Sequence, residues 1–165
     1  MAPSTPGKAQ QARRRRRQTT EIKESLRELS IQLSLLNLQV GAHLDLNYVD
    51  LHCLDLINRV GPLSPTALAR RAGVHPATMT GVLDRLQRAG WIVRERDPDA
   101  ADRRAVTIRA VRDRNAELFT LYSGMNNSMD DIFAGYSEEE LTLLADFIRR
   151  TTEAGRAATD TLAGH

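Results

Sequence analysis

The sequence predicts a mainly α-helical fold that carries a small β-hairpin (α+β). Two short helices begin at Ser64-Pro65 and His75-Pro76, and the gap of about three residues between them is typical of a helix-turn-helix. Two short strand-like segments with a polar loop between them follow directly, which makes the pattern a winged helix-turn-helix. Long segments with heptad spacing flank this centre and predict long N- and C-terminal dimerisation helices.

The first of the two short helices has local signals at both ends. Ser64 suits the N-cap, and Pro65 suits the first helical position because the N–H that proline lacks would be unpaired there. Arg70 and Arg71 lie in the last turn, where positive charge complements the helix dipole. Gly73 is expected to end the helix.

The second short helix is predicted from His75-Pro76 to Gly90, which closes it as the residue after the C-cap. One face is apolar: Met79, Val82, Leu83 and Leu86. The other face carries small and polar residues that are expected to be exposed: Ala77, Thr78, Thr80, Gly81, Arg85 and Arg88. The following strands are predicted at 91–96 and 104–109, and residues 97–103 form the turn between them.

Heptad seams extend the chain on both sides of the winged centre. A helix from Thr19 to Gly41 has apolar residues spaced 4-3-4-3-4: Ile22, Leu26, Leu29, Leu33, Leu36 and Val40. The same spacing recurs after the hairpin: Leu118, Tyr122, Met125, Met129, Ile132 and Tyr136. These seams exceed what one small domain can cover, so residues of about 18–40 and 111–160 are expected to form dimerisation helices.

The composition limits the kind of protein. A length of 165 residues suits one domain, expected at 18–165 with its winged core at about 44–110. No apolar run of about 18 residues exists, so no membrane span is expected. The single cysteine, Cys53, excludes an internal disulfide and fits a reducing cytoplasm. It falls on the apolar stripe of a helix expected at about 44–60, where a structural thiol is favoured over a reactive one.

Charge is divided unevenly along the chain. Residues 61–110 contain nine basic and five acidic residues, whereas residues 111–165 contain five basic and ten acidic ones. Residues 1–17 hold six basic residues, no acidic ones and almost no apolar ones, so a disordered basic tail is expected there. Its Arg13–Arg17 run could bind DNA phosphates or a minor groove, or could simply be solvated.

Several residues in this order resemble the MarR family of bacterial transcription regulators. The resemblance is dense over residues 44–110 and is carried by Leu68-Ala69, Val74, Thr78, Thr80, Asp84-Arg85-Leu86, Gly90 to Arg94 and Asp102-Arg103-Arg104. The Asp-x-Arg pattern of the wing, here Asp102 and Arg104, is its most specific mark. The family commonly continues with Leu-Thr-x-x-Gly, and this chain departs from that pattern at residues 108–113.

The resemblance implies a cytoplasmic homodimer that binds double-stranded DNA at a near-palindromic operator. Two recognition helices would then enter major grooves about 34 Å apart. It also implies that Arg104 enters the minor groove with Asp102 orienting it, and that a small aromatic or anionic effector binds between the dimer helices and the DNA-binding lobe. No cofactor is implied.

We expect base reading from the exposed face of the recognition helix, because small residues allow close approach and threonine offers a hydroxyl and a methyl group. The base-reading candidates are Ala77, Thr78, Thr80, Gly81 and Arg85. The phosphate candidates, for which plain solvation is the alternative, are Arg70, Arg71, Arg88, Arg94, Arg96 and Arg103.

Enzymatic motifs are missing from the sequence. There is no glycine-rich phosphate loop, no Gly-x-Ser-x-Gly and no pair of metal ligands at usable spacing, so neither an enzyme nor a metal site is predicted. The alternative to DNA binding is a winged helix that serves protein–protein assembly. The basic centre of the chain counts against this alternative.

Overall fold

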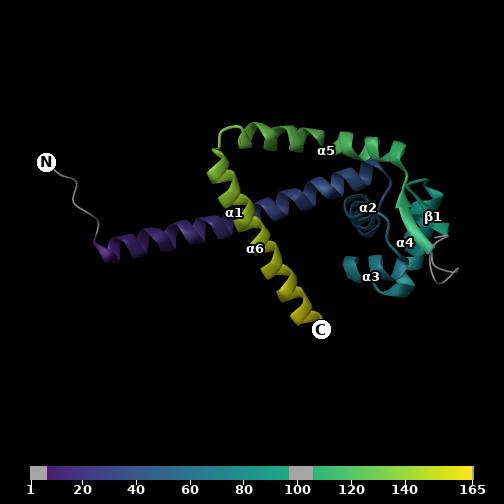
Figure 1. The fold of residues 1–165 in the computed structure, drawn as a ribbon, viewed down its shortest axis with the longest axis horizontal. Helices are drawn as coiled ribbons and strands as arrows, with labels where there is room; N and C mark the ends of the chain where they lie inside the picture. Colours follow the sequence, from purple (N-terminus) through teal and green to yellow (C-terminus); the bar gives the residue numbers. More distant parts are fainter. Residues whose placement is uncertain (1–6, 97–105, 165) are drawn as a thin grey trace. The chain divides into compact units, whose positions relative to one another are not determined.

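The computed structural model describes residues 7–96 and 106–164 of the chain (Figure 1). The elements, in chain order, are α1 (Lys8–His43), α2 (Tyr48–Val60), α3 (Pro65–Ala72), α4 (Pro76–Arg88), β1 (Ile92–Arg96), β2 (Val106–Ala110), α5 (Arg112–Phe133) and α6 (Glu138–Ala163). They divide into two compact units, one ending at Leu118 and the other beginning at Phe119. The predicted mainly helical fold with a two-stranded hairpin is confirmed.

The first helix is longer than the sequence predicts. Residues 8–17, expected to belong to a disordered tail, form the first turns of α1, so that prediction is wrong for these residues. The prediction rested on low hydrophobicity, whereas Ala, Gln and Arg have high intrinsic helix propensity. The Arg13–Arg17 run therefore lies on an exposed helix.

A tight corner joins α1 to α2. The sequence predicts the second helix from Leu44, but α2 starts at Tyr48, because Asn47 is its N-cap and accepts the N–H of Asp50 at 2.9 Å. Within the corner the N–H of Leu46 donates to the carbonyl of Gly41 at 2.8 Å. A Cβ at Gly41 would lie 2.7 Å from the carbonyl oxygen of Leu46, so this approach requires glycine.

The helix-turn-helix follows the predicted boundaries. The hydroxyl of Ser64 accepts the N–H of Ala67 at 3.2 Å, and Gly73 ends α3 in the left-handed conformation with φ of 64°. Helix α4 then runs from Pro76 to Arg88, and Gly90 follows it with φ of 76°. Local capping signals therefore place the recognition helix as expected.

The hairpin is antiparallel, with Ile92 opposite Ala110 and Arg96 opposite Val106. The described part of the second strand runs from Val106 to Ala110, and the first two residues of the predicted strand, 104 and 105, lie outside the described residues. Ile108 also pairs with Leu63, which precedes α3. This bridge ties the base of the wing to the helix-turn-helix. The turn between the strands lies outside the described residues.

The hydrophobic core lies in the first unit, where α2 packs against α1, α3, α4 and β2. Its largest fully buried side chain is Trp91, between α4 and β1. The other fully buried side chains are Leu54, Ile57, Leu68, Met79, Leu83, Leu86, Ile92, Ile108, Val82 and Cys53.

The second unit has a different character. It contains the later part of α5 and all of α6, which Ser137 and Glu140 begin with a reciprocal capping box, as predicted. None of its described side chains is buried. Its exposed large apolar residues are Phe119, Met129, Ile132, Phe133, Tyr136, Leu143, Leu144, Phe147, Ile148 and Leu162. Across the described ranges no helix has the length and apolar character to cross a membrane.

Candidate nucleic-acid interface

Helix α4 presents two different faces, as its sequence predicts. Met79, Val82, Leu83 and Leu86 are buried against the first unit. Ala77, Thr78 and Thr80 are exposed, and Gly81 is half-exposed. The hydroxyl of Thr80 lies 3.5 Å from the carbonyl oxygen of Pro76, which is a weak contact that leaves the group available to a DNA base.

His75, where the sequence predicts the second short helix to begin, also caps that helix with its side chain. It is the N-cap of α4, and its Nδ1 accepts the N–H of Ala77 at 3.2 Å. An imidazole nitrogen that accepts a hydrogen bond carries no hydrogen, so the N–H of this ring is at Nε2. The exposed ring therefore offers an N–H donor at the start of the recognition helix.

The structure gives Arg85, one of the expected base-reading residues, a partner on another helix. Its Nε donates to Oδ2 of Asp50 at 2.8 Å and its Nη2 donates to Oδ1 at 2.7 Å. These hydrogen bonds raise the pKa of Arg85. Sequence reasoning missed this pair because its members are 35 positions apart and no local pattern links them.

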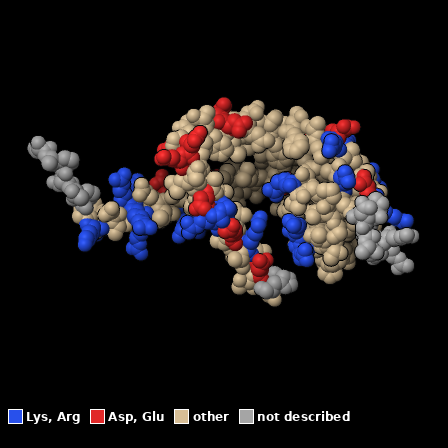
Figure 2. Space-filling view, in the orientation of Figure 1, with Lys and Arg blue, Asp and Glu red and all other residues tan. Residues whose placement is uncertain are grey.

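The described phosphate candidates lie on the surface of the first unit. Arg70, Arg71, Arg88 and Arg96 are exposed. Arg94 instead pairs with Asp84, its Nη2 lying 2.5 Å from Oδ1, which links β1 to α4. On the visible face, Figure 2 shows Lys and Arg gathered around the winged helix and along the start of α1. Asp102, Arg103 and Arg104, predicted for the wing, lie outside the described residues.

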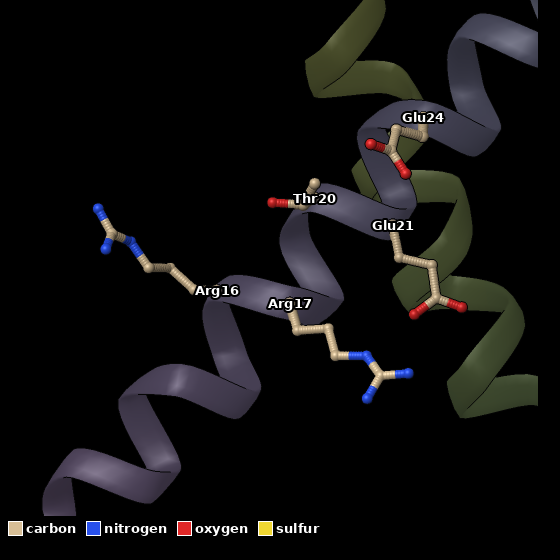
Figure 3. Close-up of a pocket in the computed structure, with 5 residues that line it drawn as sticks. All are labelled: Arg16, Arg17, Thr20, Glu21 and Glu24. Atoms are coloured by element: carbon tan, nitrogen blue, oxygen red, sulfur yellow. The ribbon is translucent and has the colours of Figure 1, made fainter.

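One surface depression lies along α1 and is lined by Arg16, Arg17, Thr20, Glu21 and Glu24 (Figure 3). All five residues come from neighbouring turns of a single exposed helix. Figure 3 shows the side chains of Arg16 and Arg17 extending to different sides of α1. The depression is therefore the side of one helix rather than a ligand-binding cavity.

The comparisons with known proteins agree with this geometry. A family model described as the MarR family matches residues 46–106. The HTH-type transcriptional regulator YcgE of Bacillus subtilis, itself uncharacterised, is 30% identical over 127 residues, which are 77% of this chain and 81% of YcgE. This chain belongs to the MarR family. A second relative, the HTH-type transcriptional repressor YetL of Bacillus subtilis, is 34% identical over 53% of this chain and 54% of its own length.

Solved structures show the same MarR fold. A MarR family protein from Bacillus stearothermophilus has a TM-score of 0.64 at 18% identity, over 86% of this chain and 97% of its own. The transcriptional regulator Tm0710 from Thermotoga maritima has a TM-score of 0.59 at 22% identity, over 86% and 98% of the two chains. As a MarR family member, the chain is a winged helix-turn-helix transcriptional regulator.

Cys53 lies on α2 of this MarR family chain and is fully buried. Burial, together with the nearby charge of Asp50, raises the pKa of the Cys53 thiol to about 11. The thiolate is the reactive form of cysteine, and it is therefore scarce at neutral pH. This environment supports the interpretation of Cys53 as a structural thiol.

We expect the stability of the protein to fall as pH rises from about 9 to about 11. The thiol in the unfolded chain ionises near its ordinary pKa of 9.0, whereas the folded chain keeps the proton up to about 11, so this contribution is complete below 9 and is lost above it. Urea unfolding of wild type and Cys53→Ala at several pH values measures the effect. Equal pH slopes for the two proteins would contradict it.

Proposed function

We propose that this MarR family regulator binds a near-palindromic operator in double-stranded DNA as a homodimer. Each protomer inserts α4 into the major groove, and the hairpin of residues 92–110 serves as the wing. The exposed face of α4 reads bases through Ala77, Thr78 and Thr80. The surface arginines around it hold the phosphates and fix the register of the protein on the duplex.

The exposed apolar surface of the long helices carries the homodimer. On α1, Ile31, Leu35 and Leu38 are each at least half exposed, and Leu38 reaches 59%. In the second unit, Leu143 is 70% exposed and Ile132 is 59% exposed. Exposed apolar surface on this scale is rare on monomers, and a second copy of the same chain supplies a complementary surface by symmetry.

The test combines the oligomeric state with DNA selection. Sedimentation at micromolar concentration should give a dimer, and the purified protein should enrich a near-palindromic duplex from a random library. Half-sites one helical turn apart, about 34 Å, are expected from two symmetry-related recognition helices. A monomer in sedimentation, or an enriched site with a single half, would contradict the homodimer.

A winged helix used only for protein–protein assembly is the second candidate. It predicts no shift of random duplex at low salt, whereas the proposed regulator should bind random DNA weakly and the enriched duplex tightly. The exposed arginines Arg70, Arg71, Arg88 and Arg96 favour the DNA-binding function.

The arginine run on α1 is expected to add affinity without sequence preference. Successive helical residues are about 100° apart, so only two or three of Arg13–Arg17 can face one phosphate backbone. Replacing all five with glutamine, which keeps the helix, should lower the slope of log K against log salt by about 0.9 for each phosphate that the variant no longer neutralises. The affinities for the operator and for random duplex should fall by the same factor, as measured in titrations at four salt concentrations.

The matched control for this run is glutamine at Arg149 and Arg150 on α6, two exposed arginines paired with acidic neighbours on the same helix. This control should leave the salt slope unchanged. An unchanged slope in the Arg13–Arg17 variant would instead mean that the run is only solvated.

The wing and the effector complete the proposal. Following the MarR pattern, Arg104 enters the minor groove and Asp102 orients it, with Arg103 on a phosphate. A small aromatic or anionic effector acts between the long helices and the DNA-binding lobe and shifts operator affinity. A rise in melting temperature with a screened ligand would identify the effector, because a ligand that binds the folded state stabilises it.

A further inference from the structure

Asp50 is the one charged side chain that is buried among the residues described in the structure. It lies in the first turn of α2, where its N–H donates to Oδ1 of Asn47 and its Oδ2 accepts the Nδ2–H of Asn47, both at 2.9 Å. The cap and the carboxylate thus hold each other in one position. A buried carboxylate needs such partners because burial removes its hydration.

Arg85 completes the coordination of this carboxylate from the recognition helix. Two parallel hydrogen bonds, from Nε and Nη2, fix the plane of the guanidinium. The side chain of Asp50 is 3% exposed, whereas that of Arg85 is 44% exposed. One edge of the guanidinium therefore lies against the buried carboxylate while the rest of the side chain remains accessible.

The accessible edge lies on the exposed side of α4, which faces DNA in the proposed function. Asp50 takes the Nε–H and one N–H of Nη2, whereas a guanidinium has five N–H donors. A Cβ built on Gly81 would meet Nη1 of Arg85 at 3.4 Å, so Nη1 lies beside the residue that has no side chain. Gly81 is on the face opposite the buried stripe of α4, where the DNA backbone or a base edge can approach.

We propose that Asp50 is a positioning residue that holds the outer edge of Arg85 for hydrogen bonding to a guanine in the major groove. This inference rests on the proposed function. The two outer nitrogens, Nη1 and Nη2, each retain an N–H directed away from Asp50, and this pair matches the O6 and N7 acceptors of guanine. Arg85 thus reads a base only because Asp50 fixes its orientation beside Gly81.

Asp50→Asn tests the positioning role on the duplex enriched by wild type. The variant should lose about tenfold or more in operator affinity, since the bidentate contact of Arg85 with a guanine is no longer held in position. Random DNA should bind equally well or more tightly, because the substitution removes a negative charge. Measurements are made where circular dichroism shows every variant folded. The matched control, Asp55→Asn, removes a half-exposed carboxylate from α2 that pairs with Arg59, and should leave the operator affinity unchanged.

A double-mutant cycle separates positioning from general stability. Arg85→Lys keeps a cation opposite Asp50 but loses the planar fork, and therefore should lose operator affinity. Asp50→Asn should then cost little further in the Arg85→Lys background. An equal cost in both backgrounds would show that Asp50 acts through the stability of the lobe, and would overturn the inference.

Replacing individual operator guanines with 7-deazaguanine tests the base. At one guanine in each half-site, removal of N7 should lower the operator affinity of wild type. The same change should not affect the operator affinity of Arg85→Lys. If Arg85→Lys lowers the affinities for operator and random DNA equally, and no such guanine exists, Arg85 contacts a phosphate and the guanine assignment is wrong. Failure to enrich any duplex would overturn the proposed function together with this inference.

Discussion

A glutamate in place of Phe147 should separate the protein into monomers and lower operator affinity by about a thousandfold, because a single half-site retains little of the specific binding energy. Phe147 lies on the apolar face of α6 and is 38% exposed in the single chain. A carboxylate introduced there would be desolvated without a partner in the proposed interface. Sedimentation velocity and fluorescence polarisation with labelled operator measure the two effects.

The control for this change is Thr142→Glu. Thr142 is exposed on the side of α6 opposite Leu144 and Phe147, so the variant adds the same charge away from the proposed interface. It should remain dimeric with unchanged operator affinity. Should Phe147→Glu also stay dimeric and bind fully, the apolar face of α6 takes no part in association.

Replacing Trp91 with alanine should lower the free energy of unfolding by about 3–5 kcal/mol, a large part of the stability of a domain of this size. The indole is fully buried, and the guanidinium of Arg114 lies 4.1 Å from the centre of its ring. The backbone of Trp91 also accepts the N–H of Val111 at 2.9 Å and donates to Leu86. Loss of the ring should therefore loosen both the wing and the end of α4, and DNA affinity should fall with stability.

Phenylalanine at this position distinguishes packing from hydrogen bonding. Within the described part of the chain, Nε1 of Trp91 has no hydrogen-bond partner, so phenylalanine removes a buried donor that gains nothing from folding. Trp91→Phe should consequently be much less destabilising than Trp91→Ala. Urea unfolding followed by circular dichroism compares the two, and equal losses would show that the indole N–H is satisfied in solution.

The sequence predicted best those elements whose signals are local. The Ser64 cap, the Gly73 stop and the apolar stripe of α4 all act within a few residues, so helix boundaries in the helix-turn-helix followed from them. The start of α1 does not follow from hydrophobicity, which is low over residues 8–17, whereas the helix propensity of Ala, Gln and Arg favours it. Leu44 and Leu46, which the sequence predicts as part of the second helix, lie in the corner before α2. Their apolar character continues the apolar stripe of that helix, so the sequence alone does not distinguish buried corner residues from helical ones.

The site was only partly predictable for a different physical reason. Exposure of Ala77, Thr78 and Thr80 follows from helical periodicity, and the structure agrees. The pairing of Asp50 with Arg85 depends on the packing of α2 against α4, which no spacing in the sequence encodes. An arginine on a helix facing DNA looks alike in sequence whether its guanidinium is unrestrained or fixed by a carboxylate.

Every buried side chain among the described residues lies between Val40 and Leu118. The two parts of the chain should therefore differ in how their melting temperatures depend on protein concentration. The DNA-binding lobe encloses its own core, so its folding equilibrium is unimolecular. The described helices beyond Phe119 enclose none, and in the proposed homodimer their order depends on a bimolecular equilibrium. Dilution should then lower the melting temperature of these helices through mass action, while the lobe melts at a temperature independent of concentration.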